Sequence, residues 1–172
     1  MANEISQYLT FSLYNEKYAV SVSNVREILE VIPITRVPGM PDYMKGVLNL
    51  RGSVVPVIDL RKKFSLPDIE NTIDTSIIIL EIINGEEMML IGALVDSVQE
   101  VINISSEEIE PSPTLGMSMK TDFITGMFQH DKDFLIILNI NKVLSSEEII
   151  SLPKKTEITS KDNENAATEK AK

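Results

Sequence analysis

The sequence predicts a mainly β protein made of two small, similar barrels with short helices. Three observations support this prediction. Short apolar segments with a strand pattern recur along the chain, tight turn signals separate them, and two halves of the chain repeat the same order of segments. About five short strands per half, joined by such turns, are typical of small barrels.

The first half opens with a predicted hairpin and a predicted helix. Residues 8–13 alternate between apolar and polar, a turn follows at 15–17, and residues 18–20 return. The next apolar residues have helical spacing, and a serine before them could cap a helix that ends before Pro33. These residues are Val22, Val25, Ile28, Leu29 and Ile32.

A second predicted hairpin occupies residues 46–60, with two apolar strands around a turn that ends at Gly52. Pro56 favours an edge position or a bulge for the second of these strands. Residues 60–64 then predict one short helical turn.

The second half begins with the strongest local signal in the chain. Asn84-Gly85 separates two apolar segments, 76–83 and 88–95, and both turn residues accept the positive φ that a tight hairpin requires. Later segments predict a capping box at Ser105, a loop over 111–120, and a last hairpin over 123–138 with a short helix after it.

A weak internal repeat organises these elements. Residues 24–28 match 97–101 at an offset of 73, and residues 55–60 match 135–140 at an offset of 80. The repeat predicts one domain, 1–152, with lobe 1 at about 15–64 and lobe 2 at about 65–152. The N-terminal strand 8–14 is a candidate for sharing between lobes. Residues 153–172 are too polar to bury much surface and predict a disordered tail.

Composition excludes several classes of protein. The 172 residues include 26 acidic and 16 basic side chains, one His and no Cys, which argues against nucleic-acid binding, disulfides and thiolate metal sites. Residues 1–64 have a net charge of +2 and residues 65–152 one of −13. Either this is chance, or the lobes differ in electrostatic character and face different partners.

No signal segment or long apolar run is present, and the Met1 start and polar end favour a complete, soluble cytoplasmic protein.

Reactive groups do not converge in any known catalytic pattern. His130 lies beside an acidic turn, and no serine elbow or phosphate-binding glycine loop occurs, so we expect no enzyme, metal or cofactor. The alternative from another class is a small acid/base hydrolase that uses Asp59 and Asp96, each at the end of an apolar strand. It requires a concave pocket that holds both carboxylates.

Surface features give the sharper hypothesis. Arg51 lies at the tip of a turn, where its guanidinium could bind a carboxylate or a carbonyl of a partner. The predicted helix carries Val25, Ile28 and Val31 at spacings of three, with Glu27 beside them, and has a second apolar face. One face could pack on a barrel while the other meets a partner.

Several of these segments, in this order and spacing, resemble the CheW family of bacterial chemotaxis coupling proteins. They are NVREI at 24–28, ITRVP at 34–38, KGVLNLRGSVVPVIDL at 45–60, IGALVDSVQEV at 91–101 and FITG at 123–126. The resemblance extends from about residue 8 to residue 152, and the segment around Asn-Leu-Arg-Gly is highly specific.

The resemblance implies two intertwined five-stranded SH3-like barrels and a non-enzymatic adaptor. The implied partners are the regulatory domain of a CheA-type histidine kinase and the cytoplasmic tip of methyl-accepting chemoreceptors. It also implies a chain that is monomeric in isolation, does not insert into the membrane, and is recruited to membrane receptor arrays. A coupling module in a related array with another output is the alternative within this class.

The resemblance also assigns residue roles. The expected partner-binding residues, together with Val31 of the apolar stripe, are Val25, Glu27, Ile28, Arg51, Val98 and Val101. Gly46 and Gly52 are expected to meet backbone requirements rather than to contact a partner.

Overall fold

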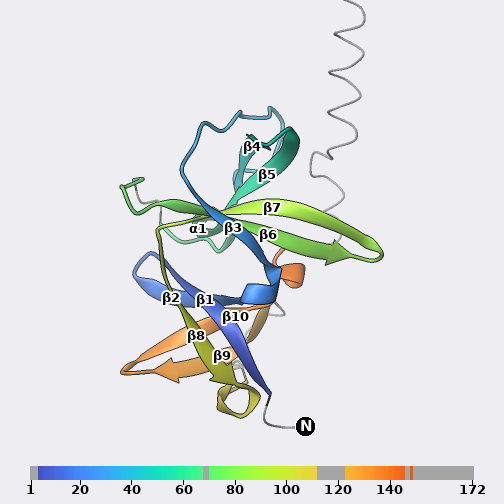
Figure 1. The fold of residues 1–172 in the computed structure, drawn as a ribbon. Coiled ribbons are helices and arrows are strands. Elements are labelled where there is room, and N and C mark those ends of the chain that lie inside the picture. The colour runs from blue at the N-terminus through green and yellow to red at the C-terminus, as the bar shows by residue number, and fades with distance from the viewer. Residues whose placement is uncertain (1–3, 68–69, 112–122, 146–147, 149–172) are drawn as a thin grey trace, which may run out of the picture.

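A computed structural model of the protein describes residues 4–67, 70–111, 123–145 and 148, and these form two five-stranded sheets (Figure 1). Sheet A has the order β8-β1-β2-β10-β9, and sheet B has the order β3-β6-β7-β5-β4. The prediction of a mainly β protein with five strands per lobe is therefore confirmed. Sheet A contains β1 (Ile5–Leu13), β2 (Glu16–Ser21), β8 (Ser97–Ser105), β9 (Ile124–His130) and β10 (Asp133–Leu138). Sheet B contains β3 (Val25–Glu30), β4 (Met44–Leu50), β5 (Ser53–Asp59), β6 (Ser76–Asn84) and β7 (Glu87–Val95).

The chain crosses between the sheets twice, which makes them intertwined. It leaves sheet A after β2, builds all of sheet B, and returns to sheet A at β8. Each half of the sequence supplies a hairpin, an edge strand and a second hairpin. Parallel pairs, β2 with β10 and β5 with β7, join the hairpins within each sheet. The division between the sheets thus differs from the expected lobe boundary near residue 64.

The internal repeat has a structural counterpart in both sheets. Beyond β3, Thr35 pairs with Val47 on β4, and beyond β8, Glu110 pairs with Met127 on β9. Each bridge links the end of one edge strand to the strand at the opposite edge of the same sheet. The short helices also correspond, because α1 (Leu60–Lys63) follows β5 and the 3-10 helix η3 (Ile140–Lys142) follows β10.

The predicted helix over 22–32 is wrong beyond its first turn. Only η1 (Val22–Asn24) is helical, with the Ser21 hydroxyl accepting from the Ser23 N–H, and the chain then forms β3 along β6. A bulge between Val25 and Glu27 shifts the register of β3. Burial still alternates along β3, but the exposed face carries the apolar Ile28 beside the half-buried Leu29. The sequence therefore shows helical spacing of apolar residues where the structure has a strand. A second 3-10 helix, η2 (Ser106–Glu108), follows β8 and has the predicted capping box.

The main core lies between the sheets. Phe11 and Val20 of sheet A and Ile78 and Leu80 of sheet B belong to one buried cluster. The opposite face of β6 contributes to a second cluster within sheet B. A strand buried on both faces has no polar alternation, which explains the continuous apolar run over 77–80. A smaller cluster, Ala19, Ile104 and Ile137, fills sheet A.

The charge difference between the two halves of the sequence does not become a difference between the lobes. Residues 25–96, which include sheet B, carry seven basic and eleven acidic side chains. Residues 4–24 and 97–145, which include sheet A, carry four basic and nine acidic side chains. Both lobes are therefore acidic, and the hypothesis of lobes with opposite character is wrong. Each sheet takes strands from both halves of the chain, and this mixes their charges.

The tail predicted at 153–172 and most of the loop predicted at 111–120 lie outside the described residues. Within the described part of the chain, no helix has the length and apolar character needed to cross a membrane.

Candidate interaction surface

Five of the predicted partner-binding residues, four of them apolar, lie on two corresponding edge strands. β3 is an edge of sheet B and β8 is an edge of sheet A. Val25 and Val98 are half-buried and pack against the shared core. Three residues further along each strand, Ile28 is 45% exposed and Val101 is 50% exposed. Each strand therefore begins at the boundary between the sheets and presents an apolar side chain to solvent at the same repeat position.

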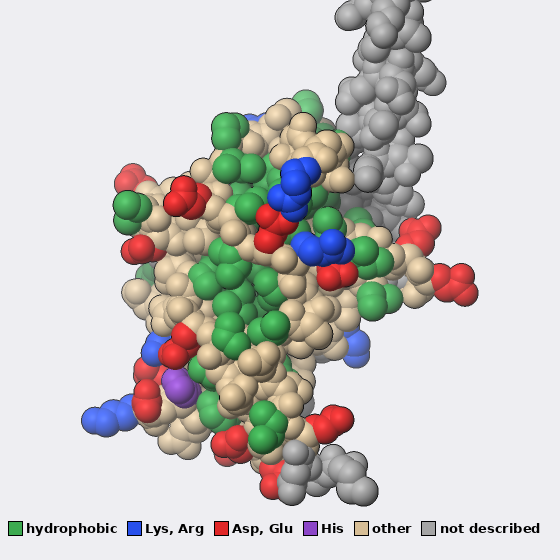
Figure 2. All heavy atoms as spheres, in the orientation of Figure 1, with side chains coloured by type: hydrophobic (Ala, Val, Ile, Leu, Met, Phe, Trp, Pro, Cys, Tyr) green, Lys and Arg blue, Asp and Glu red, His purple; other side chains and the backbone are tan. Residues whose placement is uncertain are grey.

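These residues define an apolar surface, here called the β3–β8 surface: Ile28 and Val101 with Val25 and Val98 beneath them, and Val31 just beyond β3. Val31 is also exposed. β3 and β8 both run across the face seen in Figure 1. In the same orientation, Figure 2 shows a patch of hydrophobic side chains in the middle of that face, with charged side chains around it. Such a combination of apolar centre and polar rim is typical of a protein interface.

Arg51 and Glu27, both predicted site residues, form an ion pair. Arg51 has a φ of +50° in the turn between β4 and β5, and its side chain is 71% exposed. Its Nη1 donates to Glu27 Oε1 at 3.3 Å, and its Nη2 pairs with Oε2. The hydrogen bond from Arg51 lowers the pKa of the Glu27 carboxyl, and the same bond raises the pKa of Arg51. Since β3 and β4 are opposite edges of sheet B, the pair ties the turn to the strand of the β3–β8 surface.

The turn itself depends on Gly52, which has a φ of +86° and donates its N–H to Asn49 Oδ1 at 2.7 Å. A side chain at Gly52 would meet open space. Gly46 differs, because a Cβ there would overlap the Thr35 carbonyl oxygen, and its φ is +145°. The two glycines are therefore required for different reasons. Gly52 is required because its backbone has a positive φ. Gly46 is required for the same reason and also because the backbone of Thr35 lies too close for a side chain.

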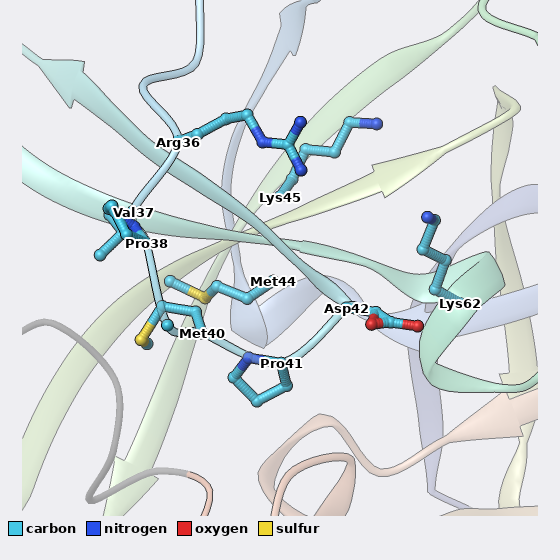
Figure 3. A pocket seen from close by; sticks show the side chains of 10 residues that line it. Arg36, Val37, Pro38, Met40, Pro41, Asp42, Met44, Lys45 and Lys62 are labelled. Atoms are coloured by element: carbon cyan, nitrogen blue, oxygen red, sulfur yellow. The ribbon is translucent and has the colours of Figure 1, made fainter.

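A pocket that sequence reasoning missed lies between the segment 36–45 and α1 (Figure 3). This basic pocket has a volume of about 400 Å³, and its lining includes Arg36, Lys45 and Lys62 with one acid, Asp42. Met40 and Met44 supply apolar wall. The excess of basic residues in the first half of the chain was the only sequence feature that could have indicated this pocket. Lys62 is distant in sequence from residues 36–45, and the pairing of β4 with β5 brings it to the pocket.

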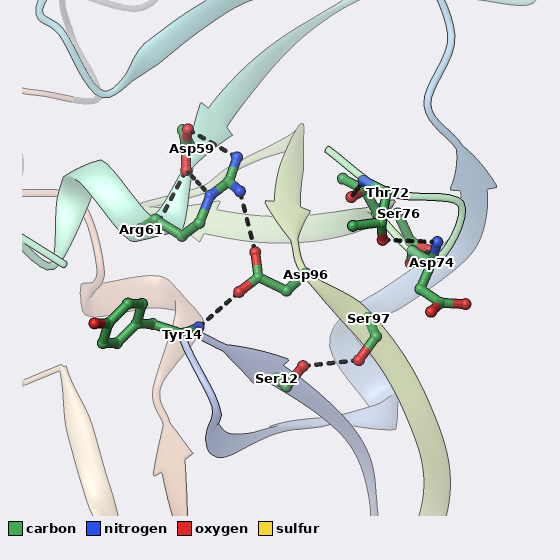
Figure 4. A network of polar contacts seen from close by, with 10 residues as sticks. Ser12, Tyr14, Asp59, Arg61, Thr72, Asp74, Ser76, Asp96 and Ser97 are labelled. Carbon is green, nitrogen blue, oxygen red and sulfur yellow. Dashed lines mark hydrogen bonds and ion pairs between the residues drawn. The ribbon is translucent and has the colours of Figure 1, made fainter. Parts of the chain in front are cut away.

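Asp59 and Asp96 are joined by Arg61 rather than placed in a pocket (Figure 4). Asp59 and Arg61 are buried, and Arg61 Nε donates to Asp59 Oδ1 at 3.1 Å while Nη1 donates to Asp96 Oδ1 at 3.1 Å. Asp96 Oδ2 accepts from the N–H of Tyr14, in the turn between β1 and β2. These carboxylates hold sheet A to sheet B, and neither lines the basic pocket. The geometry thus gives no support to the hydrolase alternative.

The described residues offer no group of three or more metal-ligating side chains. His130 lies 3.9 Å from the nearest oxygens of Glu100 and Asp131, on the surface of sheet A.

Comparison with known proteins settles the family. A family model described as a CheW-like domain matches residues 7–148. The chain belongs to the CheW-like family. It is 37% identical over 143 residues to the chemotaxis protein CheW of Klebsiella aerogenes, with 83% of this chain and 84% of that protein covered. It is 39% identical over 140 residues to CheW of Bacillus subtilis, with 81% of this chain and 86% of that protein covered.

A solved structure agrees with the fold. The crystal structure of the scaffolding protein TtCheW from Thermoanaerobacter tengcongensis matches with a TM-score of 0.75 and 32% identity, over 84% of this chain and 96% of that one. The CheW-like chain is therefore an adaptor protein of chemotaxis signalling and not an enzyme.

Proposed function

We propose that this CheW-like protein couples methyl-accepting chemoreceptors to a CheA-type histidine kinase. The observation that carries the proposal is the β3–β8 surface, where exposed Ile28 and Val101 lie at equivalent positions of the two lobes. The cytoplasmic tip of a chemoreceptor is a helical hairpin. An amphipathic helix binds by placing its apolar side chains in an apolar surface, while charged groups at the rim set its orientation.

The kinase regulatory domain binds elsewhere on the chain, so that receptor and kinase are held together. In the cell the protein joins receptor arrays at the membrane through these contacts, and at low concentration it is a monomer. Support for this arrangement comes from the family relationship and from the limited extent of the hydrophobic patch on the face seen in Figure 2.

The direct test is binding of the purified chain to a folded CheA-type regulatory domain and to a receptor hairpin tip, first separately and then together. A ternary complex is expected. If neither partner binds, although both are verified as folded, the chain has the family fold without the coupling function.

Ile28→Asp is expected to weaken receptor binding at least ten-fold while the chain stays folded. Ile28 is nearly half exposed, so the charge costs little in the free protein, but a bound receptor helix would bury it. Isothermal titration with the receptor hairpin measures the loss, and Phe134→Asp on β10, which is 47% exposed, is the matched control. Equal loss in both variants would argue against the β3–β8 surface.

Arg51→Ala is expected to leave the melting temperature nearly unchanged and to weaken partner binding about five-fold or more. The exchange Glu27→Arg with Arg51→Glu then separates two explanations. If the ion pair acts by fixing β3 to the turn, the exchanged protein recovers binding; if the Arg51 guanidinium contacts the partner itself, it does not. Unchanged binding in Arg51→Ala would reject any role for this residue.

A further inference from the structure

The basic pocket gathers positive charge in a chain whose net charge is −10. Its three cationic side chains come from three segments, since Arg36 lies beyond β3, Lys45 on β4 and Lys62 on α1. The bridge between Thr35 and Val47 holds the first two of these segments together. Like charges gathered in one pocket repel each other, and an anion placed among them relieves that repulsion. The pocket is therefore a candidate anion site.

The protein itself does not neutralise two of these cations. Arg36 and Lys45 make no ion pair with any residue that the structure describes. Lys63 provides the contrast, because its Nζ lies 2.6 Å from Glu148 Oε2 and 4.7 Å from the centre of the Tyr43 ring. The charge of Lys63 is thus compensated within the chain, whereas Arg36 and Lys45 are available to a ligand.

Hydrogen bonds and prolines fix the walls of the pocket before any ligand binds. The Met44 N–H donates to the Pro41 carbonyl at 2.9 Å, and the Asp59 N–H donates to the Tyr43 carbonyl at 2.7 Å. Pro38 and Pro41 restrict the backbone of the same segment. A site that is formed in advance loses little conformational entropy on binding. Its volume of about 400 Å³ is in the range of small-molecule sites.

The lining favours one class of ligand (Figure 3). Three cations and one acid, Asp42, give the pocket a local charge of +2, which matches the nearly double negative charge of a phosphate monoester at neutral pH. The Arg36 guanidinium can donate two parallel hydrogen bonds to phosphate oxygens. Met40 and Met44 also line the pocket, and methionine sulfur makes favourable contacts with aromatic rings. The pocket thus combines features that suit a phosphate and an attached ring.

We propose that the basic pocket binds a small phosphate monoester that carries an aromatic ring, the chemistry of a nucleoside monophosphate. Arg36 and Lys45 bind the phosphate, and Lys62 adds to the positive field. The ring lies on the side chains of Met40 and Met44. Because Arg36 and Lys62 are exposed to solvent, their attraction for the phosphate is partly screened, and we expect a dissociation constant of about 0.1 to 1 mM.

This site is independent of the proposed coupling function. It uses neither Ile28 nor Val101 nor Arg51, and a ligand in the pocket leaves the side chains of the β3–β8 surface uncovered. Ligand binding and receptor binding can consequently be measured on the same variants, and one can fail without the other.

The test is an NMR titration of the isotope-labelled full chain with AMP, GMP, CMP and UMP. At least one of them should shift the amide resonances of residues 36–45 and of Lys62 in a saturable manner, and less in high salt. The same ligand should bind at least ten-fold more tightly than inorganic phosphate or its own nucleoside, because each of these makes only half of the contacts.

Variants of the pocket assign the two halves of the ligand. Arg36→Gln/Lys45→Gln should weaken binding of the monophosphate at least ten-fold, whereas Lys132→Gln, in an exposed turn of sheet A, should bind as wild type does. Met40→Ser should weaken binding of the monophosphate and leave the affinity for inorganic phosphate unchanged. Circular dichroism and receptor affinity, both expected to stay as in wild type, show that each variant is folded.

Several outcomes would overturn the proposal. All four monophosphates could fail to shift these resonances at about 10 mM, or inorganic phosphate could bind as tightly as they do. Unchanged affinity in Arg36→Gln/Lys45→Gln would place the ligand elsewhere. If the monophosphates fail and this variant loses affinity for the kinase regulatory domain, the pocket binds a protein segment rather than a small molecule.

Discussion

Replacing Gly46 with alanine is expected to reduce the free energy of unfolding by about 3 kcal/mol or more. Gly46 has a φ of +145°, and a Cβ on it would overlap the carbonyl oxygen of Thr35. That carbonyl accepts from the N–H of Val47 at 2.8 Å, and the Thr35 N–H donates back to Val47 at 2.8 Å. The added methyl group must therefore either break this bridge or displace β4, and both strain and lost hydrogen bonds contribute.

Gly52→Ala is the matched control for this prediction. Gly52 also has a positive φ, but nothing lies within 4 Å of the position of its Cβ. Its substitution should cost only about 1 kcal/mol, the penalty of left-handed backbone. Urea unfolding of both variants measures the difference. Similar losses in the two would mean that the backbone angle, rather than the approach of Thr35, makes glycine necessary at residue 46.

Gly126 is the counterpart of Gly46 in sheet A. A Cβ there would meet the carbonyl oxygen of Glu110, the residue that bridges to Met127. The offset of 80 residues that matches 55–60 with 135–140 also aligns these two glycines, but it does not indicate why both are present. The structure supplies the reason, since each sheet brings the segment beyond its edge strand against the opposite edge at the same point. This contact links the two opposite edges of each five-stranded sheet.

Local signals predicted much of this fold. Asn84-Gly85 predicted the β6–β7 hairpin, although its turn residues are Gly85 and Glu86 and Asn84 pairs with Glu87. The turn at Arg51-Gly52 predicted the β4–β5 hairpin, because a tight turn depends on a few adjacent residues. The repeat predicted two similar lobes of five strands. It could not show that β3–β5 pack with β6 and β7, since strand pairing across a crossover depends on packing of the complete chain and not on any short segment.

The residues of the candidate site were chosen from the sequence, and their role in binding stays a prediction; the sequence did not predict how they are arranged. Ile28 and Val101 were chosen from the sequence, yet Ile28 was assigned to a helix face and lies on an edge strand. Glu27 and Arg51 were chosen separately and proved to be partners. The pairing requires opposite edges of sheet B to approach each other, a property of the closed sheet that no local pattern records. The basic pocket escaped notice for the same reason.

Arg61→Met is expected to destabilise the chain by about 3–5 kcal/mol, the usual effect of removing one partner from a buried ion pair. Asp59 would keep its charge in the interior and lose the donors on Nε and Nη2 of Arg61. Asp96 would lose its link to α1, which weakens the connection between the sheets. Thermal unfolding followed by circular dichroism provides the measurement, and a loss below about 1 kcal/mol would show that the charge is not held in the interior.

A double substitution distinguishes a buried charge from lost packing. The equivalent of Asp59 in the second repeat is Asn139, which caps η3 by accepting from the Asn141 N–H at 3.1 Å, and Asn141 takes the place of Arg61. A neutral residue is therefore compatible with this geometry. Asp59→Asn should rescue part of the stability lost in Arg61→Met, so that the double variant loses less than the sum of the single losses. Strict additivity would instead assign the effect of Arg61 to its packing.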